Sequence, residues 1–341
     1  MHNGELHGGG NELKKLPLTS SLSKEGERFA GDPSNVMSIL VVGSVAFDSV
    51  KTPFGEAKEI LGGSASYFSI SASFFSPVNL VAVVGNDFPQ EHLDLFEKFA
   101  VDTRGLQRVA GKTFRWTGEY GFALNEAKTL DTQLNVFESF KPEIPVGYRN
   151  CEYVFLGNID PVLQRQVLAQ VSKPKFVACD TMNYWINSKP DELKKTLAQV
   201  NILIINDGEA RMLTGQPNIT KAAKTICSWG PRILVVKKGE YGVAMYANGS
   251  IFGAPAFPLE EVFDPTGAGD TFAGGFVGFL AKSARLDDET LRKAVIYGSV
   301  MASFNVEDFS LNRMKRLKHS EIQERFRQFK DLTHFEHDHS F

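Results

Sequence analysis

The chain has 341 residues, of which 43% are hydrophobic and 23% are charged, and its net charge at pH 7 is −3. These values exclude a collagen-like, low-complexity or wholly disordered chain. Because the charge is close to neutral, the sequence predicts neither a nucleic-acid partner nor a membrane-surface partner. The longest apolar stretch, residues 272–281, is about half the length of a membrane-spanning helix.

Composition along the chain predicts three segments. Residues 1–36 are rich in Gly, Ser, Lys and Glu, which predicts a disordered leader. One domain is expected over residues 37–330, and residues 331–341 are expected to form a frayed tail. The three cysteines are far apart and form no C-x-x-C pair, so the sequence predicts no disulfide framework and indicates a cytoplasmic location.

Within the domain, short apolar runs alternate with helical patterns. Such runs are typical of strands buried on both faces of a mostly parallel sheet. The predicted strands cover residues 38–43, 79–84, 152–156, 175–179, 201–205 and 232–236. The predicted helices cover residues 64–76, 89–100, 161–171, 190–199 and 219–228. This alternation indicates an α/β fold whose ligands bind beyond the carboxyl ends of the strands.

Two segments, residues 46–61 and 112–140, break this pattern. They alternate polar and apolar residues around the turn residues Pro53, Gly55 and Asn125. We therefore expect two antiparallel hairpins that form a small second sheet and act as a lid over the ligand.

The strongest motif is Asp264-Pro-Thr-Gly-Ala-Gly-Asp270, which precedes an apolar stretch of small residues. It predicts a glycine-rich turn at a helix N-terminus, where free N–H groups bind an anion. The N–H groups of Gly267, Ala268 and Gly269 would hold the charge on a transferred phosphoryl group, and Asp270 would take the proton of the attacking hydroxyl. The alternative is that Asp270 only caps the helix.

A second glycine-containing segment, residues 110–114, ends like a phosphate-binding P-loop. The P-loop pattern requires a glycine at the position of Leu106, and a helix should follow rather than the strand-like residues found here. We therefore reject a P-loop at this place.

The residues from Asp264 onward closely resemble the C-terminal signature of the PfkB/ribokinase family of carbohydrate and nucleoside kinases. Residues 41–50, 61–75, 206–215 and 235–242 resemble further family elements in the expected order. The resemblance spans residues 37–312. It implies a ribokinase-like fold, with a mostly parallel central sheet flanked by helices and a small β-sheet lid. It also implies a kinase that uses ATP and Mg²⁺ to phosphorylate a hydroxyl group of a small sugar or related polyol.

On the nucleotide side, Asn206 and Glu209 match the family's N-x-x-E element. The resemblance places this pair near the phosphates, with Glu209 acting on Mg²⁺ through water; the alternative is that Glu209 only favours the helix dipole. Further positions expected to line the nucleotide are Lys237, Gly239, Gly242, Asp264, Thr266 and Ser299. For Lys237, the alternative is a solvated charge. For Ser299, the alternative is plain helix packing.

On the acceptor side, Asp48 follows the first apolar strand. A carboxylate there accepts two hydrogen bonds from neighbouring hydroxyls, and Gly62 and Gly63 let the backbone approach a ligand or form a tight turn. Tyr67 stands where family members often have a substrate-binding Asn, so a ribose-type hydroxyl pattern does not carry over.

Several acceptors stay open. A sugar is the first expectation, and a nucleoside is the second because Tyr67 and Phe47 are suited to pack a base. An inositol-type polyol is the third, and a sugar phosphate would need cations such as Lys112 and Arg115.

Two hypotheses of another class are weaker. A non-catalytic ligand-binding homologue would have little reason to retain both Asp270 and the Gly-Ala-Gly turn. A dinucleotide oxidoreductase would need a G-x-G-x-x-G element that the first strand lacks. Residues 302–310 do not match the family's usual cation site, which leaves potassium dependence open. A homodimer through the lid is expected by analogy, since sheet edges invite pairing.

Overall fold

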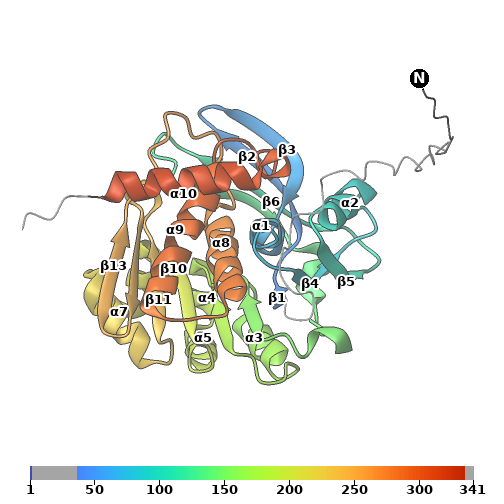
Figure 1. The fold of residues 1–341 in the computed structure, drawn as a ribbon. Coiled ribbons are helices and arrows are strands. Elements are labelled where there is room, and N and C mark those ends of the chain that lie inside the picture. The colour runs from blue at the N-terminus through green and yellow to red at the C-terminus, as the bar shows by residue number, and fades with distance from the viewer. Residues whose placement is uncertain (2–36, 335–341) are drawn as a thin grey trace, which may run out of the picture.

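The computed structural model describes Met1 and residues 37–334. It shows a large central sheet with helices on both faces and a small second sheet at one end (Figure 1). The predicted leader, apart from Met1, and residues 335–341 of the predicted tail lie outside the described residues. None of the helices in the described part of the chain has the length and apolar character that a membrane span requires.

The central sheet has nine strands in the order β13-β12-β11-β10-β9-β8-β1-β4-β5. Neighbouring strands are parallel from β5 to β11, whereas β12 pairs antiparallel with both β11 and β13. In chain order the strands are β1 (Ile39–Val42), β4 (Val78–Val84), β5 (Val101–Arg108), β8 (Tyr153–Leu156), β9 (Phe176–Cys179), β10 (Ile202–Asn206), β11 (Ile233–Lys237), β12 (Val243–Ala247) and β13 (Ser250–Ala254). The predicted mostly parallel sheet is confirmed.

Each face of the central sheet has its own apolar core. Ile39 and Val41 of β1 face one cluster, and the alternate residues Leu40 and Val42 face the other. The first face is covered by α1 (Ser64–Ala72), α2 (Gln90–Lys98), α8 (Ala268–Ser283), α9 (Asp288–Asn305) and α10 (His319–Thr333). The second face is covered by α3 (Pro161–Leu168), α4 (Asn183–Ser188), α5 (Pro190–Leu197), α6 (Asp207–Thr214) and α7 (Ile219–Ser228).

The small sheet has the strand order β3-β2-β6-β7. Both predicted hairpins are confirmed, as β2 (Ala46–Thr52) with β3 (Gly55–Gly62) and as β6 (Phe114–Tyr120) with β7 (Ala127–Gln133). The hairpins are joined by a parallel pairing of β2 with β6, which the sequence does not predict.

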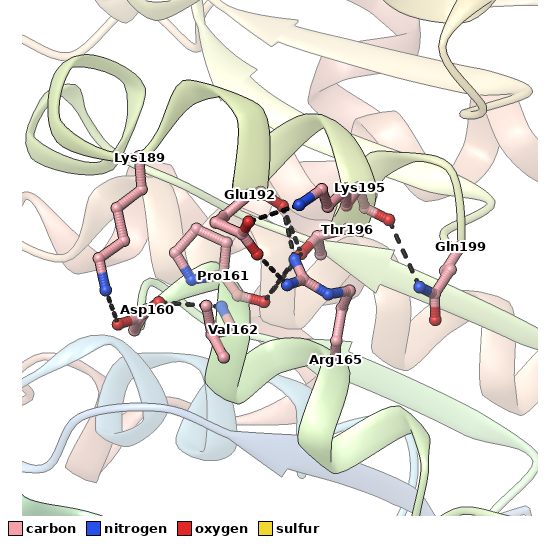
Figure 2. Close-up of polar contacts among 9 residues, drawn as sticks. All are labelled: Asp160, Pro161, Val162, Arg165, Lys189, Glu192, Lys195, Thr196 and Gln199. Atoms are coloured by element: carbon pink, nitrogen blue, oxygen red, sulfur yellow. Dashed lines mark hydrogen bonds and ion pairs between the residues drawn. The ribbon is translucent and has the colours of Figure 1, made fainter.

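A polar clamp ties α3 to α5 on the second face (Figure 2). Arg165 forms an ion pair with Glu192 and donates to the Thr196 hydroxyl at 3.1 Å, while Asp160 caps α3 and pairs with Lys189 at 2.5 Å. On the same helix α3, Gln164 donates to the carbonyl oxygens of Gly157 and Asp180, each at 3.0 Å. The clamp therefore fixes the two loops that follow β8 and β9.

Candidate active site

The predicted functional residues meet at the carboxyl ends of the parallel strands. Asn206 ends β10 and lies in register with Lys237, which ends β11. Asp180 follows directly after the neighbouring strand β9. The N-terminus of α8 reaches the same place, because Gly269 lies against the Lys237 ammonium group. This is where ligands bind in open α/β sheets.

The glycine-rich turn forms the N-cap of α8. Gly267 has a φ of 74°, a left-handed conformation that favours glycine, and as a glycine it has no side chain with which to cap the helix. Asp270 lies in the first turn of α8, so a capping role stays the alternative to its role as a base. The Ala268 N–H donates to the Pro265 carbonyl at 3.2 Å, whereas the N–H groups of Gly267 and Gly269 donate to no backbone carbonyl in the described chain. Two of the three predicted donors are thus free for an anion.

Buried polar contacts hold this turn in place. The fully buried Asp264 carboxylate accepts hydrogen bonds from the N–H groups of Thr266 at 2.9 Å and Ser310 at 3.2 Å. Asn305 of α9 donates to the Thr266 carbonyl at 2.8 Å and accepts from the Thr271 hydroxyl at 3.1 Å. In this structure Asp264 thus supports the turn from behind. The Thr266 hydroxyl bonds to the Tyr120 hydroxyl of the small sheet at 3.2 Å.

One cation lies among three carboxylates beside the turn. The Lys237 ammonium lies 4.0 Å from Asp180, and a Cβ added to Gly269 would be 2.6 Å from it. Burial alone would lower the pKa of Lys237, but the carboxylates of Asp180, Glu209 and Asp270 raise it. Lys237 is therefore not the solvated charge of the alternative interpretation.

Burial also shifts the acids of this cluster. It raises the pKa of Asp270 to about 7, with a further rise from Asp180 that Lys237 opposes. Burial and Asp180 raise the pKa of Glu209 to about 7 in the same way. A carboxyl group whose pKa lies near neutrality is suited to general acid–base chemistry.

Asn206 and Glu209 form a reciprocal cap at the start of α6. The Asn206 side chain accepts from the Glu209 N–H at 2.7 Å, and Glu209 Oε2 accepts from the Asn206 N–H at 2.8 Å. The pair thus has the structural role of a capping box. This role uses one oxygen of the Glu209 carboxylate and leaves the other for a ligand.

Asp48 lies on β2, close against the Gly62–Gly63 segment. A Cβ on Gly62 would lie 1.9 Å from the Asp48 carboxylate, and a Cβ on Gly63, where φ is 89°, would lie 2.6 Å from the Ser44 carbonyl. Burial, followed by the charge of Asp264, raises the pKa of Asp48 to about 8. Both glycines are required for this close approach.

Tyr67 links the acceptor side to the glycine-rich turn. Its ring packs on Gly267, since a Cβ there would lie 2.4 Å from ring carbons. The Tyr67 hydroxyl is buried and has no hydrogen-bond partner among the described residues. Burial raises the pKa of Tyr67 well above its usual value.

Strand alternation separates residues that the sequence grouped together. Phe47 neighbours Asp48 on β2, so its ring lies on the opposite face, where it packs against Phe88 and His92. Arg115 forms ion pairs with Glu59 and Asp87 and stacks over Phe47. Phe47 therefore does not share the face of Asp48, and the Arg115 guanidinium is already paired with two carboxylates.

Two aromatic residues that the sequence analysis missed share the face of Asp48. Trp116 is in register with Asp48 across β2 and β6, and Tyr120 follows four residues later on β6. The Trp116 ring lies over Gly118 and donates to the Thr129 hydroxyl at 3.2 Å. Period-two alternation along residues 114–120 was the signal that would have found them.

The remaining predicted nucleotide residues are more dispersed. Gly239 lies against Asn125 at the tip of the β6–β7 hairpin, and Gly242 lies against the Ala254 carbonyl. Ser299 is half-buried on α9, next to Gly298, which packs on Phe272 of α8. In the described part of the chain, no hydrogen bond joins Ser299 to the other predicted site residues.

Comparison with known proteins identifies relatives of this chain. A family model described as pfkB family carbohydrate kinase matches residues 36–316. The chain is 31% identical over 262 residues to the cytidine kinase of Thermococcus kodakarensis, covering 74% of this chain and 92% of that protein.

Solved structures show the same fold at lower identity. The nucleoside kinase of Methanocaldococcus jannaschii matches with a TM-score of 0.70 and 19% identity, covering 86% of this chain and 99% of that one. A putative Ribokinase II from E. coli in complex with ATP and Mg²⁺ matches with a TM-score of 0.71 and 16% identity, covering 86% and 100%. These likenesses confirm the ribokinase-like fold, and the family model shows that the chain belongs to the pfkB family of carbohydrate kinases.

Proposed function

We propose that this protein transfers the terminal phosphoryl group of Mg·ATP to a hydroxyl group of a nucleoside. The observation that supports this most directly is the N-terminus of α8, where two free N–H groups lie beside the Asp270 carboxylate and the Lys237 ammonium. An anion bound there would have a general base and a cation as its neighbours. This arrangement fits phosphoryl transfer.

In the proposed reaction Asp270 acts as the general base. Its carboxylate takes the proton of the acceptor hydroxyl as that oxygen forms its bond to phosphorus and the bond from phosphorus to the leaving oxygen breaks. The N–H groups of Gly267 and Gly269 hold the charge on the transferred oxygens, and Asp48 orients the acceptor. Bound Mg·ATP supplies the phosphoryl group and a metal that neutralises its charge.

The residues present fit Mg·ATP. Free N–H donors at a helix N-terminus and a buried ammonium suit phosphate oxygens. Only one oxygen of Glu209 is used by the capping box, which leaves the other to bind a metal-bound water. Mg²⁺ usually keeps several waters, so one carboxylate is sufficient.

A nucleoside acceptor is favoured over the sugar that the sequence analysis placed first. Trp116 and Tyr120 lie on the same face as Asp48, and an aromatic ring is suited to stack on a base. The relative at 31% identity is named cytidine kinase. A free sugar is the second candidate, since Asp48 suits paired hydroxyls and the family model is named for carbohydrate kinases.

A homodimer through the small sheet and a cytoplasmic location stay predictions.

Coupled release of ADP tests this proposal. The protein is assayed with Mg·ATP against cytidine, other nucleosides, ribose, other sugars and inositol. We expect a nucleoside to stimulate ADP release most strongly and to be recovered as its monophosphate. Stimulation by a sugar alone would overturn the nucleoside, and no stimulation by any acceptor would contradict the kinase assignment itself.

A further inference from the structure

Asp180 is a buried carboxylate that no sequence motif singles out. Its backbone carbonyl accepts from Gln164 at 3.0 Å, and its Oδ1 accepts from the Thr181 N–H at 2.8 Å. The other oxygen, Oδ2, is the one that lies 4.0 Å from the Lys237 ammonium. The backbone and one carboxylate oxygen are thus fixed, and the second oxygen faces the lysine.

Lys237 extends from the end of β11 to the glycine-rich turn. Its side chain is 18% exposed, and its ammonium lies against Gly269, whose N–H is free. A lysine side chain has four rotatable bonds and loses considerable conformational entropy when it is held in one geometry. A fixed carboxylate beside the ammonium reduces the number of geometries that the lysine samples.

The surrounding charges make this placement consequential. The charges of Asp180, Glu209 and Asp270 all act on Lys237, so the cluster carries more negative than positive charge when its acids are ionised. A phosphate brought to the turn is repelled by these acids unless the ammonium lies on its side of the cluster. An ion pair buried only for stability is, by contrast, a weak stabiliser because desolvation offsets its attraction.

We propose that Asp180 is a positioning residue that holds the Lys237 ammonium at the Gly267–Gly269 turn, where the ammonium binds the terminal phosphoryl group of the nucleotide. This inference rests on the proposed function, since it takes the turn to be the phosphoryl site. It assigns Lys237 to the third phosphate in particular, because Gly269 directly precedes Asp270 in the first turn of α8.

Nucleotide binding separates this role from a structural one. The dissociation constants of Mg·AMP-PNP, a non-hydrolysable triphosphate, and of Mg·ADP are measured by calorimetry for Lys237→Met, Lys237→Arg, Asp180→Asn and the double variant K237M/D180N. The readout is the ratio of the AMP-PNP constant to the ADP constant. This ratio measures how much the third phosphate contributes to binding, and it does not require catalytic turnover.

Lys237→Met should raise this ratio about 10- to 100-fold, the range expected for one lost charge-assisted hydrogen bond. Lys237→Arg should restore part of the triphosphate preference. Asp180→Asn should raise the ratio about three- to tenfold, because the lysine is present but no longer held. In the Lys237→Met background, Asp180→Asn should add less than about twofold, because the two residues act through one ammonium.

Lys175→Met is the matched control. Lys175 pairs with Glu152 at 2.9 Å at the opposite, amino ends of β8 and β9, so its loss should leave the ratio unchanged. Because Lys237→Met leaves a buried acid unpaired, melting is followed for every variant. If that variant unfolds, K237M/D180N, which removes both charges, takes its place in the comparison.

Two results would overturn the inference. One is an Asp180→Asn ratio equal to or below that of the wild type, which would mean that Asp180 only repels phosphate. The other is full additivity in the double variant. If the wild type binds both nucleotides and transfers phosphate, either of these two results rejects the inference and leaves the proposed function standing. A wild type that binds neither nucleotide rejects the proposed function and the inference with it.

Discussion

At the scale of single residues, Trp116 offers a direct test of the acceptor. Trp116→Ala should raise the KM for a nucleoside about tenfold or more while leaving the KM for ATP within about twofold, because stacking of a base on an aromatic ring contributes roughly 1–3 kcal/mol. Trp116→Phe should restore most of the loss. Steady-state kinetics with the best nucleoside gives both constants.

The outcome distinguishes the two candidate acceptors. If Trp116→Ala raises the KM for a free sugar as much as it raises the KM for a nucleoside, the indole ring does not stack on the base of the nucleoside. Trp229→Phe is the control, because Trp229 lies at the end of α7 and packs under Lys194. This control should leave both constants unchanged.

The sequence predicted the residues of the glycine-rich turn and of the N-x-x-E element because each lies in a short contiguous motif. It missed Asp180, Trp116 and Tyr120, which reach the site only through strand pairing and the register of two sheets. It grouped Phe47 with the acceptor residues although a neighbour on a strand points to the opposite face. Their joint placement is a tertiary property that local spacing does not contain.

At the scale of elements, Asn305 joins α9 to the turn that begins α8. Asn305→Leu should lower the free energy of unfolding by about 2–4 kcal/mol, because it leaves the buried Thr266 carbonyl and Thr271 hydroxyl without partners. It should also lower kcat well beyond the loss of folded protein, since the turn is no longer held. Urea unfolding and kinetics at a temperature where the variant is folded measure the two effects.

Thr290→Val is a suitable comparison on the same helix. Thr290 bonds to Asp287 at the far end of α9, so a loss of stability there should leave kcat unchanged. Equal kcat for Asn305→Leu and the wild type would show that the turn keeps its shape without Asn305.

The fold was predictable where hydrophobic pattern alone decides it. The six predicted strands of the central sheet match the observed strands to within one residue at each end. The edge strand β5 was missed because residues 101–108 include four charged or amide side chains. The antiparallel pair β12 and β13 and the parallel β2–β6 pairing were missed for another reason, since pairing direction depends on contacts distant in sequence.

At the scale of the whole molecule, the buried acids predict a falling stability with rising pH. The unfolded chain releases the Asp48 proton near its ordinary pKa of 3.8, whereas the folded chain holds it to about 8. Between these values the folded state binds more protons, so its free energy of unfolding decreases as pH rises. Asp48→Asn should therefore stabilise the unliganded protein by on the order of 5 kcal/mol at pH 8 and about 1–2 kcal/mol at pH 5.

Urea unfolding at pH 5 and pH 8 measures this difference for the wild type and for Asp48→Asn. A gain that is equal at the two pH values would show that Asp48 has an ordinary pKa in the folded chain. Several acids buried together at one place, where they lower the free energy of unfolding, are typical of a functional site.

The proposed mechanism is tested most directly by kcat/KM for the best acceptor, compared between the wild type and Asp270→Asn. We predict a loss of at least about 1,000-fold, with the affinity for Mg·ADP and the melting temperature retained. In the wild type, kcat/KM should rise with pH through about 7, where the Asp270 carboxyl loses its proton. If Asp270→Asn instead keeps more than about a tenth of the wild-type value, Asp270 is not the general base and the proposed mechanism is wrong.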